Sequence, residues 1–155
     1  MTIIIGIDPG KSGGIASWDN SHSGYGDSFT VDKMPATEMD IASVFAEFCL
    51  TDCHAYIEKV HAMPGQGVTS MFTFGQGYGF LRGCLVAHGI PFEEVTPRTW
   101  QKSFGMKKSK TESQTQWKNR LKGKAQQLFP HLKVTLATCD ALLICEFGRR
   151  LRTHD

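Results

Sequence analysis

The chain has 155 residues, a formal net charge of +2 and 41% hydrophobic residues. A chain of this length forms about one domain, here residues 1–155, and can bury an adequate core. It contains no apolar run of membrane-spanning length and no signal-peptide pattern, so we expect a cytoplasmic protein with no membrane partner. The five cysteines lack the spacing of a disulfide framework, which fits reduced thiols in that compartment.

Basic residues are concentrated in the second half of the chain. Between Arg98 and Lys124 there are nine basic residues and one acid, Glu112, whereas residues 1–97 hold four Lys or Arg against eleven acids. An uneven distribution of this kind indicates a polyanionic partner that contacts the second half. The alternative for any one lysine-rich helix is a solvated surface.

The first predicted element is a buried strand at residues 3–7, where four isoleucines flank one glycine. Asp8 ends this strand, immediately before a turn through Pro9 and Gly10. A carboxylate at the end of an apolar strand is costly unless it is paired or binds a metal. Residues 13–18 are predicted to form a second strand that folds back on the first, and residues 25–31 a third strand at the edge.

A helix is predicted from Thr37, as its cap, to about Leu50, because apolar residues recur there at steps of three and four. Residues 54–60 then form a strand that carries Glu58 near its carboxyl end. A strand–helix–strand crossover makes this strand parallel to one of the first three. If it lies beside the first strand, Asp8 and Glu58 share the edge where open α/β sheets bind ligands.

The next helix is predicted from about Thr69 to His88, after a glycine-containing loop at residues 61–67. Gly75, Gly79 and Gly83 recur on it every four residues, and each costs about 1 kcal/mol of helix stability relative to alanine. This pattern predicts a helix face in close contact with the sheet or with another subunit. Most of the aromatic residues beside the glycines are expected in the core, and one or two near the loop are candidates to stack on bases.

The remaining elements carry the basic stretch. Residues 91–95 are predicted to be a fifth strand, and Pro97 opens a short helix. A basic loop follows at residues 105–110, and the spacing from Ser109 to Glu112 predicts a capping box for a helix that runs to about Phe129. Thr138 is expected to cap a last, apolar helix. Asp140 lies in its first turn, where the helix dipole favours an acid, and packing of this helix on the sheet would bring Asp140 towards Asp8 and Glu58.

Three carboxylates that converge in this way would repel one another and require cations. Oxygen ligands suit Mg²⁺, with Mn²⁺ as a substitute, and both ions complete their shells with water and substrate phosphate. Two such ions activate water and stabilise the leaving oxygen in phosphodiester hydrolysis. A nucleotide cofactor is not expected, because residues 6–12 lack the glycine spacing of a phosphate-binding loop and no helix pattern follows them. A small ATPase is the weakest alternative, since ATPases that open with a strand, an Asp and glycines need two such domains.

Motifs spread along nearly the whole chain resemble those of RuvC-like Holliday junction resolvases of the small phage and bacterial branch. The matching segments are residues 6–10 with 13–16, residues 57–64, residues 96–102, and residues 140–144 with 148–150. The resemblance implies an α/β, RNase H-like fold, which here would hold a five-stranded mixed sheet flanked by helices. It also implies a homodimer in a bacterial cell, from a bacterial or phage gene, that nicks four-way DNA junctions symmetrically with Mg²⁺.

The resemblance matches Asp8, Glu58 and Asp140 to the catalytic metal ligands of that family. It also implies an apolar residue inserted at the junction centre, for which Met63, Phe72 and Phe74 are candidates. With the basic residues they make up the expected DNA-binding set: Met63, Phe72, Phe74, Arg98, Lys102, Lys107, Lys108 and Lys110.

The chain departs from the family at one position. The family's fourth ligand, an Asp or His three or four residues before the last Asp, is replaced by Ala137 and Leu136. Substrate and water could hold the second ion, another residue such as His131 or Glu146 could substitute, or activity could be weakened. Two other functions stay open: a branched-DNA-binding protein with weak or lost cleavage, which the missing ligand supports, and a related nuclease for flaps or RNA hybrids.

Overall fold

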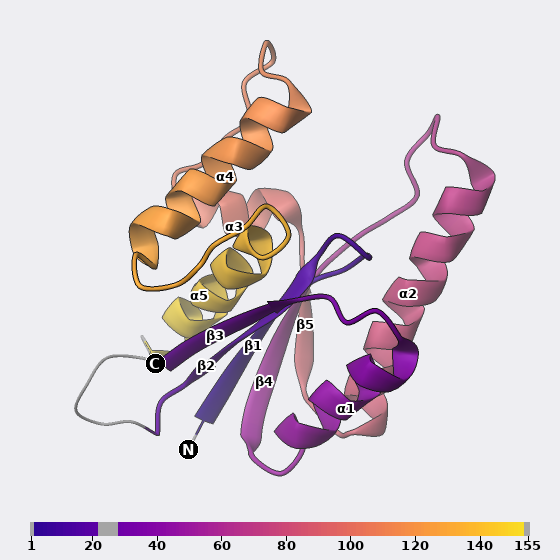
Figure 1. The fold of residues 1–155 in the computed structure, drawn as a ribbon, viewed down its shortest axis with the longest axis vertical. Coiled ribbons are helices and arrows are strands. Elements are labelled where there is room, and N and C mark those ends of the chain that lie inside the picture. Colours follow the sequence, from indigo (N-terminus) through magenta and orange to yellow (C-terminus); the bar gives the residue numbers. More distant parts are fainter. Residues whose placement is uncertain (1, 22–27, 154–155) are drawn as a thin grey trace.

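The computed structural model describes residues 2–21 and 28–153, which form a mixed sheet of five strands with helices on both faces (Figure 1). The strands lie in the order β3-β2-β1-β4-β5, which confirms the predicted sheet. The elements are β1 (Thr2–Asp8), β2 (Gly14–Asp19), β3 (Ser28–Lys33), α1 (Glu38–Phe48), β4 (Asp52–Glu58), α2 (Val68–Ala87), β5 (Phe92–Val95), α3 (Pro97–Ser103), α4 (Gln114–Leu128) and α5 (Cys139–Thr153).

Strand β1 is the centre of the sheet and is covered on both faces. It pairs antiparallel with β2 and parallel with β4. Its side chains alternate between two cores, because successive residues of a strand point to opposite faces. Ile3, Ile5 and Ile7 pack with residues of α1 and α2, whereas Ile4 packs with α5. Burial on both faces explains why β1 is continuously apolar in sequence.

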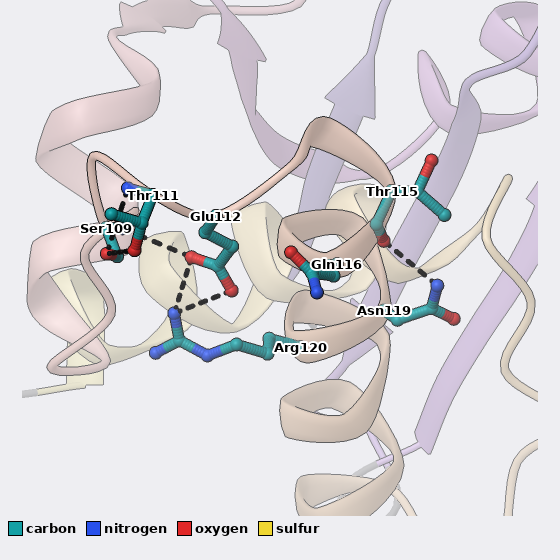
Figure 2. Close-up of a pocket in the computed structure, with 7 residues that line it drawn as sticks. All are labelled: Ser109, Thr111, Glu112, Thr115, Gln116, Asn119 and Arg120. Carbon is teal, nitrogen blue, oxygen red and sulfur yellow. Dashed lines mark hydrogen bonds and ion pairs between the residues drawn. The ribbon is translucent and has the colours of Figure 1, made fainter.

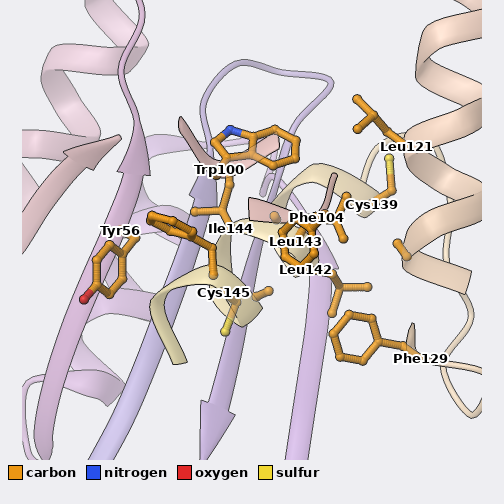
Figure 3. Packing of buried hydrophobic residues seen from close by; sticks show 14 of the residues in the cluster. Tyr56, Trp100, Phe104, Leu121, Phe129, Cys139, Leu142, Leu143, Ile144 and Cys145 are labelled. Carbon is orange, nitrogen blue, oxygen red and sulfur yellow. The ribbon is translucent and has the colours of Figure 1, made fainter. Parts of the chain in front are cut away.

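Helix α5 packs closely against the face of β1 that carries Ile4. Residues 139–148 of this helix are all buried, and Figure 3 shows Leu142, Leu143 and Ile144 among Trp100 of α3 and the residues that directly follow α3 and α4, Phe104 and Phe129. The helix approaches so closely that a Cβ atom on Gly6 would meet the backbone of Ala141 and Cys145. The backbone of α5 is therefore fixed against β1, and the start of α5 lies near the end of the sheet.

Several boundaries differ from the sequence prediction. Strand β3 runs from Ser28 to Lys33, and residues 25–27 of the predicted strand lie outside the described residues. Helix α4 begins at Gln114 because the capping box is formed by Ser113 and Gln116, not by Ser109 and Glu112. Two segments one turn apart carry the same capping spacing, and only the second is followed by helical hydrogen bonds.

The prediction for Thr138 was also wrong in detail, although α5 begins directly after it. Its hydroxyl accepts a hydrogen bond from the Thr135 backbone N–H at 3.0 Å, within the preceding turn. By contrast, Thr37 caps α1 as expected, because its hydroxyl accepts the Asp40 backbone N–H at 3.1 Å.

The glycines of α2 do not pack against the sheet. A Cβ atom on Gly75, Gly79 or Gly83 would have no atom within 4 Å. Helix α2 instead contacts the sheet through Leu81 and Leu85, which lie in the same core as α1. The sheet is therefore excluded as the partner of the glycine face.

Among the described helices, none is both long and apolar enough to cross a bilayer.

Candidate active site

Asp8 and Glu58 end two adjacent parallel strands. In the register of β1 and β4, Ile7 lies opposite Ile57, so the next residues on the two strands are the two acids. Asp8 is buried, with 9% of its surface exposed, and Glu58 is half-buried. The predicted placement of both acids at the carboxyl edge of the sheet is confirmed.

Asp140 is brought to the same edge by α5. It lies in the first turn of that helix and is buried. The negative charge of Asp140 contributes to the raised pKa of both Asp8 and Glu58. The three predicted acids therefore form one electrostatic cluster, although they come from residues 8, 58 and 140 of the chain.

Each oxygen of Asp140 has a donor within the protein. The Lys118 ammonium, on α4, donates to Oδ2 in an ion pair. The Cys139 thiol lies 3.4 Å from Oδ1 and donates to it. Burial, and then the charge of Asp140, raise the pKa of the Cys139 thiol to about 12, so the sulfur keeps its proton at neutral pH.

Glu58 is oriented by a tryptophan that lies in the core. The indole Nε1 of Trp100, on α3, donates to Glu58 Oε2 at 2.8 Å. Trp100 is completely buried and packs among the α5 residues seen in Figure 3. One carboxylate oxygen of Glu58 is thus fixed by a rigid side chain, and the other receives no protein hydrogen bond among the described residues.

The cluster holds more negative charge than its surroundings compensate. Burial raises the pKa of Asp8 well above its usual range, and the charges of Asp140 and Glu58 raise it further, while Lys118 acts in the opposite direction. Burial also raises the pKa of Glu58 to about 7, against the hydrogen bond from Trp100. Buried acids with perturbed pKa values at one edge of a sheet are typical of a functional site.

The donor chemistry of this cluster fits an oxygen-ligated divalent cation such as Mg²⁺. Burial and mutual repulsion both disfavour the charged acids, and a bound cation would reverse both effects. As the side chains lie, however, the described residues contain no three His, Cys, Asp or Glu side chains already arranged around a common point for a metal. Lys118 is bonded to Asp140, so a cation that binds Asp140 must compete with that ion pair.

The residues at the fourth-ligand position cannot bind a metal, but their backbone lies close to the site. The carbonyl oxygen of Ala137 is 3.2 Å from where a Cβ atom on Gly14 would lie, and Gly14 pairs with Asp8 in the sheet. Glu146 does not replace the ligand, because its carboxylate accepts hydrogen bonds from Arg149 and Arg150. Those two charges lower the pKa of Glu146 although burial opposes the shift.

Comparison with solved structures identifies the fold of the chain. No protein-family model matches the sequence, and no curated protein matches it. Over 96% of both chains, the structure resembles Thermus thermophilus RuvC with a TM-score of 0.61 at 13% identity. It also resembles T. thermophilus RuvC in complex with a Holliday junction substrate, over 97% of both chains, with a TM-score of 0.63 and 13% identity. The chain has the RuvC fold. A Fowlpox virus resolvase in complex with Holliday junction DNA also matches, with a TM-score of 0.49, 11% identity and coverage of 95% and 99% of the two chains.

The RuvC fold brings the basic stretch beside the acid cluster, because α4 carries Lys118 into it. Of the predicted DNA-binding residues, Arg98 and Lys102 are exposed on α3, and Lys107, Lys108 and Lys110 are exposed on the loop that follows. Lys108 donates to the Gln114 side chain at 2.9 Å. Between Arg98 and Lys124, all of which the structure describes, the side chains with acidic partners are Lys118 and Arg120. The other basic groups there remain available to an external anion.

The three predicted wedge residues lie in different environments. Met63 is exposed in the loop after β4, and Phe72 is 68% exposed in the first turns of α2. Phe74 is half-buried, and its ring lies 3.0 Å from where a Cβ atom on Gly10 would stand, in the loop that follows Asp8. Met63 and Phe72 are therefore free to contact a ligand, whereas Phe74 packs on the site loop.

A surface hollow of about 620 Å³ lies apart from the acids, at the start of α4 (Figure 2). It is lined by residues with polar side chains, among them Thr111, Thr115 and Asn119. Arg120 forms two hydrogen bonds to Glu112, at 2.9 and 3.1 Å, across the hollow. This ion pair connects the segment after the basic loop to α4 and therefore has a structural role.

Sequence reasoning missed two side chains of the site. In the sequence, Trp100 was noted only as part of the motif at residues 96–102, and Lys118 only as one of the basic residues between Arg98 and Lys124. Neither was predicted to contact an acid of the site. Both act across long sequence separations, on Glu58 and Asp140 respectively. The motif around Trp100 was a usable signal, whereas no spacing in the sequence distinguishes Lys118 from the other lysines of α4.

Proposed function

We propose that this protein is a divalent-metal-dependent endodeoxyribonuclease that resolves four-way DNA junctions by paired nicks from a homodimer. The observation that carries the proposal is the cluster of Asp8, Glu58 and Asp140 at the carboxyl edge of a RuvC-type sheet. T. thermophilus RuvC, which has the same fold, forms a complex with a Holliday junction substrate. The cluster supplies the oxygen ligands that phosphodiester hydrolysis by metal ions requires.

In this proposal Asp8, Glu58 and Asp140 hold Mg²⁺ or Mn²⁺, which would activate water and stabilise the leaving oxygen. Trp100 keeps Glu58 in a fixed orientation through the bond to Oε2. The apolar walls of β1 and α5 exclude bulk water behind the acids, because both elements are buried there. Lower solvation strengthens each electrostatic interaction in the site.

The DNA partner is supported by the exposed basic groups of α3, the helix that carries Trp100 to Glu58, and of the loop that follows it. Arg98, Lys102, Lys107, Lys108 and Lys110 would contact phosphates, which position a duplex without reading its sequence. Met63 and Phe72 are the candidates for apolar insertion at the junction centre, since both are exposed.

The homodimer is supported by the outer face of α2. Val68, Phe72 and Val86 are exposed on this helix, and Gly75 and Gly79 lie between them with open space above. Glycines allow two helices to approach closely, and one copy of the cluster can cut one strand at a time. A second copy of this chain therefore fits the face.

Gly79→Leu should abolish the dimer in light scattering, whereas Gly123→Leu, at an equally open position on α4, should not.

A substrate panel tests the proposed reaction. The protein should nick a mobile four-way junction with Mg²⁺ or Mn²⁺, cut flaps and RNA–DNA hybrids at least tenfold more slowly, and show no cleavage in EDTA. Faster cleavage of flaps or hybrids would instead identify the related nuclease as the function.

A junction-binding protein without cleavage is the second candidate. It is favoured by the Lys118–Asp140 ion pair and by the absence of a ligand at residues 136 and 137. It predicts tight, selective binding of the junction with no nick in any divalent cation.

A further inference from the structure

Lys118 differs from the other basic residues of α4 because its charge lies inside the acid cluster. Its side chain is 33% exposed, and its ammonium contacts the buried carboxylate of Asp140. It also interacts electrostatically with Asp8 and Glu58. Burial alone would lower the pKa of Lys118, but Asp140 and Asp8 outweigh it and raise the pKa, so the group is charged at neutral pH.

The charges in the cluster can be counted. With all three acids ionised, the form that a bound cation favours, three carboxylates and one ammonium sum to −2, which one divalent cation neutralises. A cluster with a fourth carboxylate at residue 136 or 137 and no lysine would sum to −4, which two divalent cations neutralise. Residues 136 and 137 are Leu and Ala, and Glu146 is neutralised by its arginines. The missing acid and the added lysine therefore both make the cluster less negative.

We propose that Lys118 is a resident cation that takes the place of a second metal ion, so that each chain binds one divalent cation. This inference rests on the metal site of the proposed function. The Lys118 ammonium competes with the bound ion for Asp140 and repels any further cation nearby. Removal of the lysine should therefore strengthen binding of the first ion, and removal together with a new acid should create a site for the second.

Titration with MnCl₂, followed by the EPR signal of free Mn²⁺, tests the inference without DNA and without an activity measurement. The wild type should bind one Mn²⁺ per chain. Lys118→Met should bind its ion about tenfold more tightly, because a like charge a few ångströms away has been removed. Lys122→Met, one turn further along α4, removes the same charge away from Asp140 and should change the affinity less than twofold.

The double variant Lys118→Met/Ala137→Asp should bind two Mn²⁺ per chain. Two ions in the wild type, one ion in the double variant, or an unchanged or weaker affinity in Lys118→Met would each overturn the inference. The number of Mn²⁺ ions bound by the wild type tests the inference even if a variant fails to fold. No Mn²⁺ binding by the wild type would refute the metal site itself, whereas one bound ion without junction nicking would refute only the nuclease function.

Discussion

At the scale of single residues, the site depends on acids that the fold leaves uncompensated. The folded-state pKa of Glu58 is about 7, above its ordinary value of 4.5. The folded chain therefore holds this proton more tightly than the unfolded chain. The resulting stability is complete below pH 4.5 and is lost as the pH rises through about 7.

This pH dependence can be measured against Glu58→Gln in EDTA. Between pH 4 and 8 the free energy of unfolding of the wild type should fall, relative to that of the variant, by on the order of 2 kcal/mol. His54 has a lowered pKa and acts in the opposite direction, but it is present in both proteins and cancels in the difference. A difference that does not vary with pH would show that Glu58 has no raised pKa.

The hydrogen bond from Trp100 to Glu58 gives a second prediction at this scale. Trp100→Phe keeps an aromatic ring in the core but removes the donor to Oε2. We expect about 1–2 kcal/mol lower stability and about tenfold slower nicking with unchanged junction affinity. Trp117→Phe, a buried indole that packs against Arg120, is the matched control. Equal nicking rates in the two variants would contradict a positioning role for Trp100.

At the scale of elements, the contact of α5 with β1 determines where Asp140 lies. A Cβ atom on Gly6 would collide with backbone atoms of α5, which cannot move aside as a side chain can. Gly6→Ala should therefore cost about 3 kcal/mol of stability. Gly123→Ala, at an open position on α4, should instead stabilise that helix by about 1 kcal/mol. Urea denaturation measures both, and a neutral Gly6→Ala would show that α5 does not lie against β1.

Most elements could be predicted from the sequence because their signals are local. The isoleucines of β1, the cap at Thr37 and the proline at the start of α3 each depend on neighbouring residues. The crossover rule predicted that β4 is parallel to one of the first three strands, and the structure shows that this strand is β1, so Glu58 lies beside Asp8. The start of α4 was predicted wrongly because two capping signals were adjacent. The partners Trp100 and Lys118 depend on tertiary packing, which no local pattern records.

At the scale of the whole molecule, the proposed function requires the basic loop and the acid cluster to act on the same DNA. Charge reversal at Lys107 and Lys108 should weaken junction binding and flatten its dependence on salt concentration. Loss of two phosphate contacts should reduce the slope of log affinity against log salt by about 2. Binding isotherms at several salt concentrations measure the slope. An unchanged slope would place the DNA backbone away from this loop.

The proposed nuclease depends on the three acids acting together as a catalytic metal site on a RuvC fold. The most direct test compares wild type with Asp8→Asn on a four-way junction in Mg²⁺, with binding and nicking measured in parallel. Asparagine removes the charge at the end of β1 and keeps the shape of the side chain. We expect the wild type to bind and nick the junction, and the variant to bind it with similar affinity and produce no nicks. Nicking by Asp8→Asn at the wild-type rate would contradict a catalytic metal site at these acids.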